Sequence, residues 1–234
     1  MLISNRHQFI YTKTVKTAST SIESYFERFC MAEGSWVQLH ARDEHDSPEG
    51  AIGYRGAKTP ANAKWWNHMS AHEIFNRIGS ERWNKYTKFC TIRNPYEKCI
   101  SAFEHFGRSL VTKDEAKASP TNKNIIDDPG SEQDEFLAYI TANMPLDRDK
   151  YTINGHFCMD EVIRYEFIHE DLQRMCDRLG VPYEPSYLPN FKADIRRPKA
   201  TADRLYTDAS KALVRQKFAY ELELFGYGFP RNHI

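Results

Sequence analysis

The sequence of 234 residues has no excess of charge of either sign, because 32 lysines and arginines balance 32 aspartates and glutamates. Proteins that bind nucleic acid generally carry a basic excess, so this balance argues against such a partner. The sequence also lacks an apolar run of membrane-spanning length and an N-terminal secretory signal. We therefore expect a cytoplasmic protein with no membrane partner.

Cysteine is scarce, and its spacing suggests no pairing. An odd total of five without a C-x-x-C pair fits reduced thiols better than a disulfide framework. Positions in apolar helix faces and strands indicate that Cys30, Cys90, Cys99 and Cys176 are small core residues. The length fits a single α/β domain over residues 1–234.

Glycine is absent between Phe9 and Ile22, which excludes a Walker A loop there. Even so, this stretch reads as a short strand, a hydroxyl-rich loop and the start of an amphipathic helix. Such a helix start suits an anion, because its first N–H groups lack partners and carry the positive end of the helix dipole. Lys16 adds a positive charge, and hydroxyl donors come from Thr17, Ser19, Thr20 and Ser21. The same hydroxyls are also typical of ordinary helix caps.

A second strand-to-helix junction follows a buried strand over residues 86–92. Arg93 comes at the carboxyl end of this strand, where open α/β sheets bind ligands. Pro95 suits the first position of a helix, and Ser101 lies about two turns further on. The planar fork of an arginine can donate two parallel hydrogen bonds to a phosphate.

Two histidines lie between these junctions. Ser70 begins a capping box, so a helix is expected from about Ala71 to Gly79, with His68 just before it and His72 in its first turn. This spacing is compatible with zinc, although H-E-x-x-H and a third ligand are absent. A hydrogen-bonded structural histidine is the other general interpretation.

In this order, the motifs resemble those of sulfotransferases that use 3′-phosphoadenosine 5′-phosphosulfate (PAPS). The loop of Lys16, Thr17, Ala18, Ser19, Thr20 and Ser21 is similar to the one that binds the 5′-phosphosulfate. Arg93 and Ser101 match the pair that holds the 3′-phosphate. The similarity is greatest to the branch with heparan sulfate 2-O-sulfotransferase and bacterial carbohydrate-type enzymes. Val15 departs from it, because proline usually precedes the lysine. Golgi relatives carry an anchor not seen here, so we expect a bacterial origin.

The resemblance implies an α/β, P-loop-like fold with a central parallel sheet flanked by helices. It implies sulfuryl transfer from PAPS to a hydroxyl of a saccharide or small-molecule acceptor, with 3′-phosphoadenosine 5′-phosphate (PAP) as product and no metal. His68, with serine two residues on, corresponds to the base that deprotonates the acceptor, and Lys16 to the group that stabilises the leaving phosphate. Arg197 and Lys199 correspond to a basic loop that often covers the cofactor in related enzymes.

Two polar segments interrupt the succession of expected strands and helices. Residues 34–60 are expected to form an irregular excursion, and residues 109–130 a polar lid or a disordered insertion. Two other functions stay open from the sequence: a P-loop-like kinase that uses ATP, and a nucleotide-binding protein that has lost catalysis. The sequence does not indicate the acceptor, the oligomeric state or whether His72 shares the base role.

Overall fold

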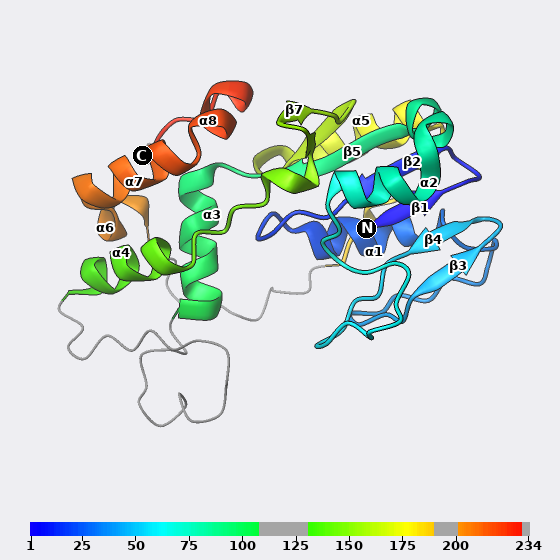
Figure 1. Cartoon of the computed structure of the whole chain (residues 1–234), viewed down its shortest axis with the longest axis horizontal. Helices are drawn as coiled ribbons and strands as arrows, with labels where there is room; N and C mark the ends of the chain where they lie inside the picture. The colour runs from blue at the N-terminus through cyan, green and yellow to red at the C-terminus, as the bar shows by residue number, and fades with distance from the viewer. Residues whose placement is uncertain (108–130, 190–200, 231–234) are drawn as a thin grey trace. The chain divides into compact units, whose positions relative to one another are not determined.

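A computed structural model describes residues 1–107, 131–189 and 201–230 (Figure 1). Within them, residues 1–92 and 147–189 form one compact unit, and residues 93–107, 131–146 and 201–230 form a second. The single-domain organisation stays a prediction, and residues 109–130 lie outside the described residues. No helix of the described part is both long and apolar enough to cross a bilayer.

The first unit contains a six-stranded mixed sheet in the order β3-β4-β1-β2-β5-β8. Strands β2, β5 and β8 run parallel, while β1 is antiparallel to both β2 and β4. The expected α/β class with a flanked sheet is therefore confirmed. The parallel part is limited to three strands, because short turns join β1 to β2 and β3 to β4 and permit only antiparallel pairing. The strand bounds are β1 (Leu2–Ser4), β2 (Phe9–Thr12), β3 (His45–Ser47), β4 (Gly50–Ile52), β5 (Thr87–Ile92) and β8 (Glu161–Arg164).

Residues 34–60 are not irregular throughout, in contrast to the expectation from sequence. They contribute the hairpin of β3 and β4, and β4 pairs with β1. Each strand has only three residues, too few for a period-two pattern to stand out between turn-forming residues. Gly50 is required by close backbone packing, since a Cβ there would lie 2.1 Å from the carbonyl oxygen of Ile3.

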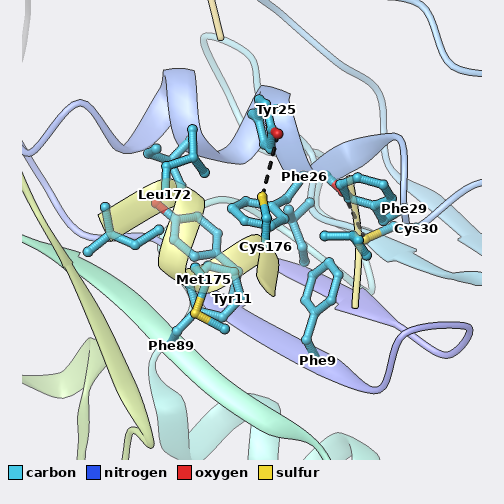
Figure 2. Packing of buried hydrophobic residues seen from close by; sticks show 14 of the residues in the cluster. Phe9, Tyr11, Tyr25, Phe26, Phe29, Cys30, Phe89, Leu172, Met175 and Cys176 are labelled. Carbon is cyan, nitrogen blue, oxygen red and sulfur yellow. Dashed lines mark hydrogen bonds between the residues drawn. The ribbon is translucent and has the colours of Figure 1, made fainter. Parts of the chain in front are cut away.

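Two helices, α1 (Ser19–Glu27) and α5 (Ile168–Leu179), pack on one face of this sheet (Figure 2). Their apolar faces meet aromatic side chains from β2 and β5, as the helical spacing in the sequence predicts. Phe26 of α1 lies edge-on to Phe89 of β5, with ring centroids 5.0 Å apart. Cys176 is buried beside the Tyr25 hydroxyl, and the cysteines are free thiols. This packed layer fixes where α1 begins relative to β2.

The rest of the first unit includes α2 (Ala71–Lys85), β6 (Thr152–Ile153) and β7 (His156–Phe157). The predicted capping box is present, because Ser70 accepts from the Glu73 N–H and the Glu73 carboxylate accepts from the Ser70 N–H. Gly79, with φ of 78°, interrupts the helix as expected, but a further helical segment continues to Lys85. His68 therefore precedes a firmly capped helix.

The described part of the second unit contains helices joined by loops and no strand. An aromatic core joins its helices; the rings of Phe136 and Tyr206, for example, have centroids 4.8 Å apart. The Tyr206 hydroxyl donates to the carbonyl of Tyr96 at 3.0 Å. As predicted, Pro95 begins the first helix of this unit. The α-helices are α3 (Pro95–Ala102), α4 (Glu132–Ala142), α6 (Ala202–Leu205), α7 (Asp208–Lys217) and α8 (Ala219–Phe225), and a π-helical segment over Phe103–Gly107 continues α3.

Candidate active site

The loop between β2 and α1 has a strained backbone. Lys16 and Ala18 adopt the left-handed conformation, with φ of 60° and 57°, although neither is glycine. Side chains disfavour this conformation, and residues held in it cluster at functional sites. Five non-glycine residues of the described part have positive φ. Three of the five, Lys16, Ala18 and His68, belong to the predicted site. Backbone strain and the sequence motifs thus point to the same place.

The start of α1 leaves main-chain donors available. Ala18 begins the helix, and no side chain caps it. Within the described residues, the N–H groups from Thr17 to Thr20 have no protein acceptor. Unpartnered N–H groups at the positive end of a helix dipole form an anion-binding site. Lys16 lies half-buried at the entrance to this turn.

The hydroxyls of this loop divide into two groups. Those of Thr17 and Ser19 are buried and bond within the protein: Thr17 Oγ1 lies 2.7 Å from Thr14 Oγ1 and 2.8 Å from Thr91 Oγ1. Ser19 Oγ donates to the Thr14 carbonyl at 2.6 Å. Their hydroxyls thus support the loop, and only their main-chain N–H groups are available to a ligand. Thr20 and Ser21 are half-buried on the first turn of α1.

His68 lies against the chain as it enters the loop. Its Nδ1 is 3.0 Å from the carbonyl oxygen of Lys13. A carbonyl can only accept, so Nδ1 carries the hydrogen and Nε2 keeps the lone pair that can take a proton. Burial, followed by the positive charge of Lys13, lowers the pKa of His68 from 6.5 to about 4. The imidazole is therefore neutral at pH 7.

Sequence reasoning missed Asp147. This residue is 3% exposed, and its carboxylate accepts a hydrogen bond from the Val15 N–H at 2.7 Å. The two residues are 132 positions apart, and Asp147 belongs to no motif, so no local signal could have paired them. Thr91 was missed for a similar reason, since one hydroxyl in an apolar strand does not reveal its partners. Both residues hold the loop rather than face a ligand.

The remaining predicted residues belong to other elements of the chain. Arg93 follows β5 directly, is 14% exposed and has its guanidinium 3.6 Å from Glu97, while Ser101 is half-buried on α3. Both belong to the second unit, and their role at a 3′-phosphate stays a prediction. Arg197 and Lys199 lie outside the described residues. His72 is exposed on α2, and the part of the chain that is described has no cluster of three or more potential metal ligands.

An open helix start, preceded by a loop whose Lys13 carbonyl holds a neutral histidine, forms a candidate site for group transfer from an anionic donor. A model of the sulfotransferase family matches residues 1–228, and the chain belongs to this family, which has a P-loop-like fold. The resemblance found in the sequence is thus confirmed.

Individual relatives agree with this assignment. Human carbohydrate sulfotransferase 9 is 26% identical over 191 residues, which cover 70% of this chain and 42% of that protein. Mouse carbohydrate sulfotransferase 11 is 24% identical over 258 residues, covering 98% of this chain and 67% of the relative. An uncharacterized protein of Archaeoglobus fulgidus is 26% identical, covering 54% of this chain and 94% of its own. No solved structure matches.

Proposed function

We propose that the chain transfers the sulfuryl group of PAPS to a hydroxyl of a saccharide or small-molecule acceptor. The observation that carries this proposal is the strained, uncapped start of α1 beside the neutral imidazole of His68, in a member of the sulfotransferase family. The family generally uses PAPS, and the relatives named carbohydrate sulfotransferases favour a saccharide acceptor.

In the proposed reaction, the bond between sulfur and the bridging phosphate oxygen breaks as sulfur bonds to the acceptor oxygen. The hydroxyl proton passes to Nε2 of His68, and PAP leaves. The N–H groups at the start of α1 bind the 5′-phosphosulfate, helped by the hydroxyls of Thr20 and Ser21. Lys16 stabilises the negative charge that develops on the leaving phosphate. The 3′-phosphate is assigned to Arg93 and Ser101.

The low pKa of His68 is compatible with a base that becomes effective once the donor is bound. In the free protein the imidazole is neutral, so it is ready to accept a proton, but a base of such low pKa is weak. The negative charges of a bound donor favour the protonated form of a nearby histidine, because opposite charges attract. Donor binding is therefore expected to raise the pKa of His68.

Replacement of the proposed base tests this mechanism. His68→Ala is expected to lower kcat by about 10²–10⁴-fold, the usual contribution of general base catalysis, with PAP affinity by calorimetry nearly unchanged. His72→Ala is the matched control, because His72 is an exposed histidine four residues further on. Unchanged turnover in His68→Ala, or an equal loss in the control, would contradict the assignment.

The choice of nucleotide tests the class of reaction. A ligand that binds the folded state raises the melting temperature according to its concentration and affinity. PAP is expected to stabilise the protein more than ATP at equal concentration. A preference for ATP would favour a kinase, while PAP binding without turnover of any acceptor in a broad screen would favour an inactive nucleotide-binding protein.

A further inference from the structure

A cluster of buried charges joins β2 to α1. Glu23 is fully buried on α1, with Oε2 of its carboxylate 2.7 Å from Lys13 Nζ and 2.6 Å from Arg55 Nη1, and Oε1 2.7 Å from the amino group of Met1. Glu27, one turn further along the helix, is also fully buried. It bonds to the same Arg55 nitrogen and lies 2.6 Å from Arg42 Nε. Each buried carboxylate thus has at least two cationic partners.

Such a cluster needs an explanation beyond stability. Removal of each ion from water costs several kcal/mol, and well-packed apolar side chains often stabilise a fold as well as a buried ion pair does. The ion pair of Lys13 with Glu23 joins two residues that are ten positions apart, and the whole strained loop lies between them. The cluster therefore fixes both ends of this loop.

The same cluster reaches His68 by two routes. Lys13, whose ammonium pairs with Glu23, provides the carbonyl oxygen that accepts from His68 Nδ1. On the other side, Tyr54 adjoins Arg55 in the chain and holds the segment before His68. The Tyr54 N–H donates to the Trp65 carbonyl, and the Tyr54 carbonyl accepts from the N–H of residue 67, each at 2.9 Å. Ring and backbone of His68 are thus both tied to the cluster.

We infer that Glu23 is a positioning residue for His68. Through Lys13 and Arg55 it holds the imidazole with Nδ1 on the Lys13 carbonyl, so that Nε2 is the nitrogen left for the proton of the acceptor. The inference rests on the proposed function in one respect only, namely that His68 is the base. Lys13 belongs to the same device, since it provides both the carbonyl and a positive charge.

The charges around His68 make this role measurable. The groups that act on it are Lys13, the amino group of Met1 and Glu23. Lys13 lowers the pKa of His68, and Glu23 raises it, so the loss of each charge shifts the pKa in opposite directions. Mere loosening of the surroundings would hydrate the imidazole and raise the pKa in both cases. The sign of the shift thus separates positioning by charge from general structural support.

The experiment measures the titration of His68 by NMR in the full chain, together with the acid limb of the pH–rate profile. Lys13→Met is expected to raise the pKa of His68 and to move the acid limb in the same direction. Glu23→Gln is expected to lower both. Lys88→Met is the matched control, because Lys88 is also buried and paired, 2.7 Å from Asp160, but lies at the beginning of β5. It should leave the titration unchanged.

Three results would overturn the inference: a wild-type titration in Lys13→Met, an upward shift in both variants, or an equal shift in Lys88→Met. If Glu23→Gln does not fold, a wild-type titration in Lys13→Met still overturns the inference, since Glu23 keeps Arg55 as a partner in that variant. Failure of the proposed function is distinguishable, because it shows as full turnover in His68→Ala. The titration of His68 in Lys13→Met needs no turnover to be read.

Discussion

Two strand-to-helix junctions follow the neighbouring parallel strands β2 and β5, and they are built in opposite ways. After β2, Ala18 begins α1 in a left-handed conformation without a side-chain cap. After β5, the Asn94 side chain accepts from the Tyr96 N–H at 3.0 Å, and Pro95 occupies the first helical position. Among the described residues, the first junction offers no side-chain cap to its helix, whereas the second caps the Tyr96 N–H with its own Asn94.

The proposed function assigns a phosphate group to each junction, and this difference then distinguishes two ways of binding it. At the first junction the proposed donors to the phosphate are main-chain N–H groups, so other groups must hold the loop in its strained conformation. These groups are the hydroxyls around Thr91, the carboxylate of Asp147 and the ion pairs of Glu23. At the second junction the proposed ligands are the side chains of Arg93 and Ser101, and Asn94 caps the start of the helix. We therefore expect the first junction to respond to pH and to remote substitutions, and the second to local ones.

The largest effect expected at the first junction is a dependence of stability on pH. Since the pKa of His68 is about 4 in the folded protein and 6.5 unfolded, the unfolded chain binds more protons between these values. The free energy of unfolding should thus decrease by on the order of 3 kcal/mol as the pH falls from 6.5 to 4. Urea unfolding at pH 7, 6, 5 and 4 measures the decrease.

His68→Asn is the control for this prediction, because asparagine keeps a polar side chain that does not titrate. The difference in stability between the wild type and this variant should change with pH in the same window, while carboxylates contribute equally to both. A difference that stays constant from pH 7 to 4 would show that burial does not hold His68 neutral.

Removal of the Thr91 hydroxyl tests the support of the first junction. Its Oγ1 lies within 3.1 Å of the hydroxyls of Tyr11, Thr14 and Thr17, and Thr91 is fully buried. Thr91→Val should lower the free energy of unfolding by about 2 kcal/mol, because buried hydroxyls lose a shared partner. Affinity for PAP should fall as well. Thr141→Val, which removes a hydroxyl from an exposed helical position, should change both quantities little.

The sequence was sufficient for the parts that depend on local chemistry. Capping residues such as Ser70 and the first-turn Pro95 marked helix starts, and the apolar run before Arg93 marked β5. The left-handed conformation of Ala18 was not predictable, because it arises from contacts around the loop rather than from the residue type. Ser and Thr can turn toward a ligand or into the protein, so the inward hydroxyl of Thr17 was equally hidden.

Asn94→Ala would make the second junction resemble the first. Loss of the cap leaves the Tyr96 N–H without its acceptor, so the free energy of unfolding should fall by about 1 kcal/mol. Hydrogen exchange should show the loss at the start of α3. Ser131→Ala, which removes the cap of α4, provides a comparison of similar size. No change at α3 would mean that Pro95 alone defines this helix start.

Ala18→Gly tests whether the first junction is strained, and its effect should be the smallest. Glycine relieves the left-handed conformation, worth about 1–2 kcal/mol, but it adds about 0.5–1 kcal/mol of chain entropy to the unfolded state. A net gain in stability of under about 1 kcal/mol is therefore expected. Affinity for PAP should stay the same, because every main-chain N–H remains. Ala138→Gly within α4 should have the opposite sign, since glycine destabilises a regular helix. Equal signs for the two substitutions would contradict the idea that this loop stores strain for its ligand.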